Sequence, residues 1–204
     1  MGLTSNFKTD LQKEQHLAIL LDSLYKKHLN HYRFKRISDL KKQLKGIDLI
    51  LTHRVTKKEF LVDEKAQLDY VNDDLPTFAF ELSYQKKGAL KKGWLFDASK
   101  KTDFYALITG IYSDEPNKFT SCKITFVNRG KLISFLKSRT ITQKSLVGFL
   151  EGSLPRHGKI KVPELDSKTE GYLYRSSYNK AEKPINLILK LGFLIDNGLA
   201  KRFI

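Results

Sequence analysis

The residues of this chain whose types and spacing best suit chemistry are Asp48, Asp63, Lys65 and Gln67. Two carboxylates that converge can bind a hard divalent cation such as Mg²⁺, which takes one or two protein carboxylates and leaves its other positions to water and substrate phosphate. A lysine beside that cation can orient or help deprotonate an attacking water, or balance charge on the phosphate. These groups together are the parts of a phosphodiester hydrolase.

One predicted β-hairpin, with the sequence GIDLILTHRVTKKEFLVDEKAQ, carries all four residues. Two apolar runs of β type, residues 47–52 and 59–66, are joined by a polar connection, which is typical of a hairpin. Side chains alternate between the two faces of a strand, so Asp63 and Lys65 share one face of the second strand. A turn centred near the middle of the connection then places Asp48 on this face, opposite Lys65 and diagonal to Asp63.

The order of these acids and the lysine resembles the motif of a known superfamily. Asp48, followed after fourteen residues by Asp63-Glu64-Lys65, is similar to the pattern of the PD-(D/E)xK nucleases, with Ile47 where the family name has proline. The resemblance implies a restriction-endonuclease-like fold. It also implies that Asp48 and Asp63 bind metal and that Lys65 assists catalysis.

The same resemblance implies supporting residues and a cofactor. Glu64 would add its backbone carbonyl to the metal coordination, and Gln67, two residues beyond Lys65 on the same face, would support the site as a glutamine does in several branches of the superfamily. Glu14 matches the acid that the first helix of these proteins often brings to the metal. The implied cofactor is Mg²⁺, with Mn²⁺ as a substitute, and no other small-molecule cofactor is expected.

The acidic-x-Lys triplet is common in a chain this rich in lysine. Residues 39–41 (DLK) and 166–168 (DSK) match it as well. What distinguishes Asp63-x-Lys65 is that it ends an apolar strand and that a preceding strand carries an acid at a matching register. The alternative is an ordinary surface hairpin whose charged face meets solvent, and the sequence leaves both interpretations open.

The strongest predicted helix spans about residues 9–29, with apolar residues at helical spacing. Glu14 precedes Leu17 by three residues and therefore lies on or beside the buried stripe. The alternative role for Glu14 is that of an acid stabilised by the dipole at a helix N-terminus. Asp10 and Asp22 are weaker candidates for an acid that this helix brings to the site.

The remaining pattern predicts an α/β fold with a mixed central sheet flanked by helices, restriction-endonuclease-like, with a basic C-terminal extension. We expect a nuclease-like core over residues 1–151, and a basic extension and C-terminal helix over 152–204, packed on the same domain. Strands are expected at 31–37, 77–84, 102–112 and 123–128, and helices at 131–138, 142–151 and 185–191.

The chain is strongly basic, with 37 Lys and Arg against 22 Asp and Glu and a formal net charge of +15. This excess favours salt-dependent association with polyanions, and the predicted metal site favours DNA among them. Residues 171–178 alternate and carry three tyrosines, which predicts either a DNA-contacting strand or an edge strand that packs tyrosines on the core. The residues expected to contact nucleic acid are Lys41, Lys42, Lys45, Lys86, Lys87, Lys91, Lys92 and Arg175.

Composition excludes several other classes of protein. With 204 residues and 41% hydrophobic content the chain is expected to fold, and no apolar run reaches the 18 or so residues of a membrane span. The single cysteine, Cys122, has no intramolecular disulfide partner and no second thiol for a zinc site. The first ten residues lack the apolar stretch of a secretory signal, so a cytoplasmic location is expected.

The function expected from the sequence is that of a Mg²⁺-dependent endodeoxyribonuclease that hydrolyses DNA phosphodiester bonds. The alternative is a non-catalytic, basic nucleic-acid-binding protein with a nuclease-like fold, and a third interpretation is a nuclease that acts on RNA. Nucleases that cut both strands often pair as two-fold dimers, so a homodimer is compatible with the first interpretation, although no interface is evident.

Overall fold

The structure is a computed structural model that describes residues 7–86, 88–115, 118–150, 157–178 and 182–204. The chain divides into two compact units that interleave along the sequence. The hairpin unit, as we name it, comprises residues 6–75, 99–129 and 200–204, and the second unit comprises residues 76–98 and 130–199.

The hairpin unit is built on a six-stranded sheet with the strand order β1-β2-β3-β6-β7-β11. β3 and β6 run parallel, and the other neighbouring strands pair antiparallel, so the sheet is mixed as the sequence predicts. The elements of this unit are α1 (Phe7–His28), β1 (Tyr32–Arg36), α2 (Leu40–Gln43), β2 (Leu49–His53), β3 (Glu59–Ala66), η1 (Leu68–Tyr70), β6 (Phe104–Glu115), β7 (Lys118–Asn128) and β11 (Ala200–Arg202).

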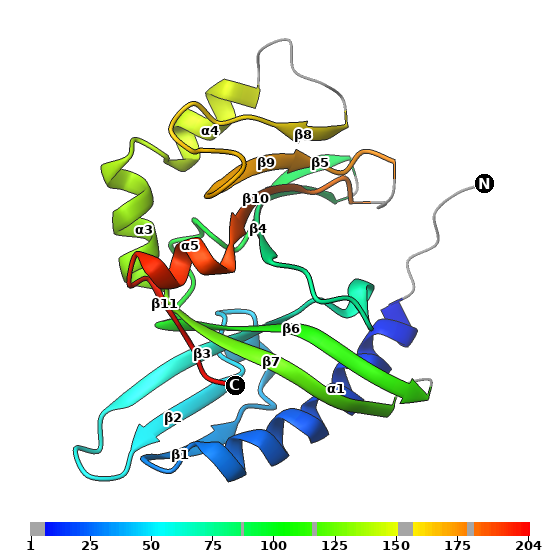
Figure 1. Cartoon of the computed structure of the whole chain (residues 1–204), viewed down its shortest axis with the longest axis vertical. Helices are drawn as coiled ribbons and strands as arrows, with labels where there is room; N and C mark the ends of the chain where they lie inside the picture. Colours follow the sequence, from blue (N-terminus) through cyan, green and yellow to red (C-terminus); the bar gives the residue numbers. More distant parts are fainter. Residues whose placement is uncertain (1–6, 87, 116–117, 151–156, 179–181) are drawn as a thin grey trace. The chain divides into compact units, whose positions relative to one another are not determined.

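Helix α1 covers one face of this sheet (Figure 1). Its buried stripe includes Leu17, Leu21 and Tyr25, which are at most 3% exposed and pack in one core with Leu49 of β2 and Val62 of β3. Burial of each such side chain contributes about 1.5–3 kcal/mol, so the amphipathic pattern read from the sequence fixes the helix on the sheet. Successive side chains of a strand point to opposite faces, and Val62 faces α1. Asp63, the next residue, therefore lies on the face of β3 that is turned away from α1.

β6 is the central strand that the apolar run at 102–112 predicts. Tyr105 to Ile108 are 0% exposed, as is Ile111, so both faces of the strand are buried over this stretch. β6 pairs with β3 on one side and β7 on the other, with Leu107 aligned to Lys65 of β3. The site residues of β3 therefore lie beside the most buried strand of the sheet, which holds their backbone in place.

The second unit contains a five-stranded antiparallel sheet with the order β5-β4-β10-β9-β8. Phe80 of β4, Leu187 of β10 and Leu173 of β9 align across neighbouring strands and are 0% exposed, so they form the centre of its buried face. The elements of this unit are β4 (Thr77–Lys86), β5 (Ala89–Lys92), α3 (Arg129–Ser138), α4 (Gln143–Leu150), β8 (Gly158–Ile160), β9 (Gly171–Arg175), β10 (Ile185–Lys190) and α5 (Leu191–Asp196).

The helix predicted at residues 185–191 is wrong. Ile185–Lys190 is strand β10, whose residues alternate between buried and half-buried, and the helix α5 begins only at Leu191. A short run of mostly apolar residues fits a buried helix or a buried strand equally well, and pairing with β4 and β9 on both sides decides for the strand.

The tyrosines of β9 do not pack on the core of the second unit. Leu173 is fully buried, whereas Tyr172 and Tyr174 on the opposite face stay partly exposed. The ammonium of Lys159 lies 4.2 Å from the centre of the Tyr172 ring. β9 is also not an edge strand, because β8 pairs along its outer side. Among the helices in the described part of the chain, none is long and apolar enough to cross a membrane.

Candidate active site

β2 and β3 form the predicted hairpin, with a register that brings the two aspartates together. Leu49 aligns with Val62, the N–H of Asp48 donates to the Val62 carbonyl at 2.9 Å, and Asp48 Oδ2 accepts from the N–H of Glu64, so Asp48 lies beside residues 62–64 of β3. The sequence predicted Asp48 opposite Lys65, two residues further along. A shift of two residues leaves every side chain on its predicted face. The same residues therefore form the site, and only the predicted spacing between Asp48 and the residues of β3 was wrong.

Asp63 is buried, with 1% of the residue exposed, and only one of its two carboxylate oxygens is hydrogen-bonded. Oδ1 accepts from the ammonium of Lys65 at 2.5 Å, and the Lys65 side chain keeps 27% of its surface exposed. Oδ2 is buried and has no hydrogen-bond partner. A buried carboxylate oxygen without a partner costs free energy, so Oδ2 is a position where a cation would be stabilising.

Asp48 is held by three backbone hydrogen bonds. Its N–H is bound to β3 as described, its carbonyl accepts from the N–H of Ile37 at 2.8 Å, and its Oδ2 accepts from the N–H of Glu64 at 2.8 Å. Burial and the negative charge of Asp63 raise the pKa of Asp48 to about 7, against the opposing effect of Lys65. A divalent cation bound between the two carboxylates would offset the repulsion between their negative charges.

Gly46 makes close approach to Asp63 possible. Its φ is +73°, and a Cβ added there would collide with the Thr102 hydroxyl and stand 3.1 Å from Asp63 Oδ2. The Thr102 hydroxyl donates to the Gly46 carbonyl at 2.8 Å. Thr102 is therefore a buried wall of the site that the sequence did not single out.

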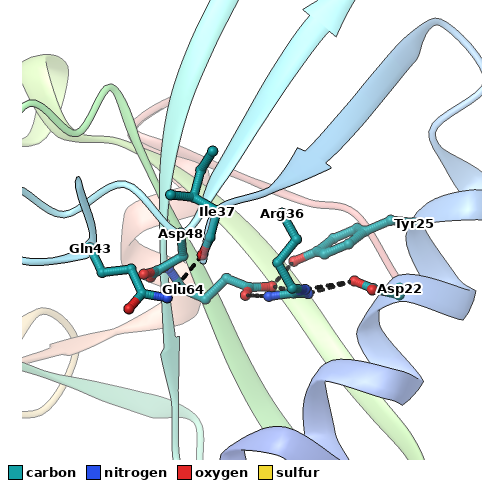
Figure 2. A network of polar contacts seen from close by, with 7 residues as sticks. All are labelled: Asp22, Tyr25, Arg36, Ile37, Gln43, Asp48 and Glu64. Carbon is teal, nitrogen blue, oxygen red and sulfur yellow. Dashed lines mark hydrogen bonds and ion pairs between the residues drawn. The ribbon is translucent and has the colours of Figure 1, made fainter. Parts of the chain in front are cut away.

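The side chain of Glu64 points to the other face of β3, toward α1 (Figure 2). Its carboxylate accepts from the hydroxyl of Tyr25 at 2.9 Å and pairs with the guanidinium of Arg36, Nη1 to Oε2 2.5 Å. Arg36 also pairs with Asp22 of α1 at 2.6 Å. This network, which we name the Arg36 network (Asp22, Tyr25, Arg36 and Glu64), holds the pKa of Tyr25 well above its ordinary value through burial and the charge of Glu64.

The sequence predicts that Glu64 binds metal through its backbone carbonyl. The contacts of the Glu64 side chain do not affect this role. In a β-strand the N–H and C=O of one residue point to the same edge of the strand. The N–H of Glu64 points to Asp48, and its carbonyl therefore leaves β3 on the same side. The carboxylate of Glu64 is committed to Arg36 and Tyr25.

Glu14 lies on α1, and Gln67 lies directly after β3. Glu14 is exposed on α1, on the α1 side of the sheet, and lies eleven residues, or about 16 Å along the helix, before Tyr25. Asp22 of α1 is linked to Glu64 of β3 through Arg36. Gln67 follows the end of β3, with its N–H bonded to the carbonyl of Ile108 at 3.0 Å and its side-chain oxygen buried.

The lysines expected to contact nucleic acid fall into both units. Lys41, Lys42 and Lys45 are exposed in and after α2 of the hairpin unit, on the segment that leads into Gly46. The others belong to the sheet of the second unit, where Lys86, Lys91 and Lys92 are exposed and Arg175 is half-buried. Lys87 lies outside the described residues.

The donor set of the site suits a hard cation that keeps part of its hydration. Asp48 and Asp63 supply carboxylate oxygens, and the carbonyl of Glu64 is a third oxygen on the same side. Within the described ranges no group of three or more His, Cys, Asp or Glu side chains is placed to hold a metal. Two carboxylates with room for water and phosphate are the usual protein contribution to a Mg²⁺ site, so the residues present fit this ion.

Sequence reasoning missed Arg36, Tyr25 and Thr102. Arg36 carried a weak signal, because it shares a face with Phe34 in a predicted strand, but nothing in the sequence indicates its partners on α1 and β3. Comparison of the chain with protein-family models, with curated proteins and with solved structures finds no match.

Proposed function

We propose that this protein is a Mg²⁺-dependent endodeoxyribonuclease of the restriction-endonuclease-like, PD-(D/E)xK type. The observation that carries the proposal is the convergence of Asp48, Asp63 and Lys65 on one face of the sheet, with the buried Oδ2 of Asp63 lacking a hydrogen-bond partner. An ordinary surface hairpin has no need of a buried aspartate beside a second carboxylate. The mixed α/β sheet of the hairpin unit is compatible with the proposal.

Each residue has a role that its surroundings support. Asp48 and Asp63 hold the cation, with the Glu64 carbonyl beside them, and the backbone bonds of Asp48 keep its carboxylate in place before substrate arrives. A bound Mg²⁺ supplies neutralisation of phosphate charge and lowers the pKa of the attacking water. Gln67, at the end of β3, supports this end of the site.

Lys65 connects the buried carboxylate to the surface. Its ammonium lies 2.5 Å from Asp63 Oδ1, while 27% of its side chain remains exposed. The ammonium can therefore balance charge on a phosphate oxygen, or orient the attacking water, while it stays within hydrogen-bond distance of Asp63. Both actions place a positive charge where negative charge develops in the transition state.

The experiment is a cleavage assay with the purified protein on supercoiled plasmid, linear duplex DNA and RNA, each with Mg²⁺, Mn²⁺ or EDTA. Nicking or linearisation of plasmid with Mg²⁺ or Mn²⁺ and none with EDTA is the expected result. The linear duplex separates an endonuclease from an enzyme that needs free ends, and the RNA arm tests the substrate class. Binding of DNA without cleavage under every condition would replace the proposal with that of a non-catalytic nucleic-acid-binding protein.

A further inference from the structure

Two segments of the hairpin unit lie side by side next to the candidate active site. The N–H of Lys101 donates to the carbonyl of Lys45 at 2.8 Å, and the ammonium of Lys100 donates to the carbonyl of Leu44 at 2.9 Å. The bond from Thr102 to the Gly46 carbonyl continues the same pairing. Residues 44–46 and 100–102 are thus tied together by three hydrogen bonds.

Gly46 lies close both to Lys100 and to the carboxylate of Asp63. The point where a Cβ on Gly46 would stand is 3.1 Å from Asp63 Oδ2 and 3.3 Å from Lys100 Cδ. The stem of Lys100 and the buried oxygen of Asp63 therefore both lie close to Gly46. The ammonium of Lys100 ends a flexible stem only one methylene beyond Cδ, so it reaches a phosphate held at the carboxylates.

The charge of these segments is positive and solvent-accessible. Lys45 and Lys101 are exposed and Lys100 is half-buried. Two of the acids near these segments are bound to backbone groups: Asp39 accepts from the N–H of Lys41 at 2.8 Å, and Asp103 accepts from the N–H of Leu61 at 2.8 Å. The three lysines therefore present charge that a polyanion can neutralise.

We propose that Lys45, Lys100 and Lys101, named here the lysine rim, bind backbone phosphates that flank the phosphate to be cleaved. The inference rests on the proposed function and deepens it, because it assigns the substrate as a polynucleotide long enough to carry neighbouring phosphates. Lys100 exchanges its bond with the Leu44 carbonyl for a phosphate oxygen. The rim contributes affinity that does not depend on the nucleotide sequence, and it positions the nucleic-acid backbone at the carboxylates.

The test is the salt dependence of DNA binding, measured in EDTA so that cleavage plays no part. A fluorescein-labelled 20-bp duplex is titrated with wild type, Lys100→Gln and Lys45→Gln between 50 and 200 mM NaCl, with anisotropy as the readout. Each variant is expected to weaken binding and to make the slope of log K against log salt shallower by about 0.9, the value for one phosphate contact. Gln keeps a long stem and an N–H donor, so the Leu44 carbonyl retains a partner.

Lys57 offers a matched control. Its ammonium also donates to a backbone carbonyl, that of Arg54 at 2.8 Å, but it lies at the far end of the β2–β3 hairpin. Lys57 precedes Asp63 by six residues, which span at most about 20 Å of extended chain. Lys57→Gln removes the same charge and is expected to leave the slope unchanged.

The outcomes separate this inference from the proposed function. A shallower slope for the rim variants, and not for Lys57→Gln, supports the rim even if the wild-type protein never cleaves DNA, in which case only the nuclease proposal fails. Slopes that equal the wild-type slope for both rim variants, with thermal melts that show folded protein, would overturn the rim and leave the nuclease proposal standing.

Discussion

Arg36 of β1 and Glu64 of β3 form an ion pair across the end of β2, with Nη1 and Oε2 2.5 Å apart. Asp48 lies at that end. Its carbonyl is bound by Ile37, the residue after Arg36, and its carboxylate is bound by the N–H of Glu64. The ion pair on one face of the sheet therefore joins the two backbone segments that hold Asp48 on the other, which makes Arg36 a positioning residue for the site (Figure 2).

Arg36→Met is expected to lower the free energy of unfolding by about 2 kcal/mol, because it leaves the half-buried carboxylates of Glu64 and Asp22 without their cation. It is also expected to shift the pH midpoint of Mg²⁺-dependent cleavage, because the backbone that holds Asp48 becomes less fixed. Urea unfolding and a pH profile of plasmid nicking measure the two effects.

Arg139→Met is the matched control for this prediction. Arg139 pairs with Glu170 at 2.7 Å in the second unit, with side-chain exposures of 32% and 20% that are close to those of the Arg36 pair. A similar loss of stability with an unchanged pH midpoint is expected. If both variants leave the midpoint where the wild type has it, Arg36 is structural only.

Asp48→Asn is expected to stabilise the metal-free protein at pH 8 by at least about 1 kcal/mol while it abolishes cleavage. The pKa of Asp48 is raised from an ordinary 3.8 to about 7 in the folded chain, so the folded state favours the neutral group that Asn imitates. If Asp48 were an ordinary surface carboxylate in contact with solvent, Asp48→Asn would not increase stability. Thermal melts in EDTA distinguish the two.

The pH dependence of that stability difference follows from the direction of the same shift. Between about pH 4 and pH 7 the folded protein binds more protons at Asp48 than the unfolded chain does, so the contribution of Asp48 to stability is full below about pH 4 and falls as pH rises to about 7. The advantage of Asp48→Asn over wild type should grow through this window, by up to about 1.4 kcal/mol per pH unit, and then level off. Urea unfolding at pH 5, 6, 7 and 8 in EDTA checks it, and a difference that is constant with pH would contradict the raised pKa.

Gly46→Ala is expected to reduce both stability and cleavage. Its positive φ strains any L side chain, and the added Cβ meets the Thr102 hydroxyl and Asp63 Oδ2. Gly88→Ala has the same strain, with φ +77°, but meets no atom within 4 Å. The loss in melting temperature common to both variants measures backbone strain, and the excess for Gly46→Ala measures the collision in the site. Equal losses and unchanged cleavage would mean that Gly46 has no part in shaping the site.

The hairpin and the central strand could be predicted from the sequence because their signals are local. Alternation along β3 separates Asp63 and Lys65 from Val62, and the apolar run of β6 predicts burial on both faces. The register of Asp48 was wrong by two residues because the position of the turn depends on a left-handed residue, Lys57 with φ 61°, whose side chain gives no such signal.

Features that depend on contacts between distant segments could not be predicted. The partners of Glu64 come from α1 and β1, and nothing in the triplet around it indicates that its carboxylate turns toward them. The apolar run at 185–190 fits a helix as well as the strand β10, and only its pairing with β4 and β9 decides for the strand. The same pairing places β4 in the sheet of the second unit, separate from the sheet that carries the site.

Lys65→Met is expected to lower the rate of cleavage by about 10²-fold or more, because it removes the positive charge beside the phosphate and the partner of Asp63 Oδ1. Binding of duplex DNA in EDTA should weaken by no more than the loss of one charge. Single-turnover cleavage and anisotropy separate the two effects. A loss of binding that accounts for the whole loss of rate would assign Lys65 to affinity alone.

The most direct test of the account is plasmid nicking with Mg²⁺ by wild type, Asp63→Asn and Asp166→Asn, purified in parallel. Asp166 begins the other triplet of the same pattern, Asp166-Ser167-Lys168, and its carboxylate accepts from backbone N–H groups of a turn that Asn also supports. If Asp63 holds the catalytic cation, Asp166→Asn nicks plasmid at the wild-type rate and Asp63→Asn has no activity above a control without protein. Equal nicking by all three proteins, or none by any of them, would contradict that role for Asp63.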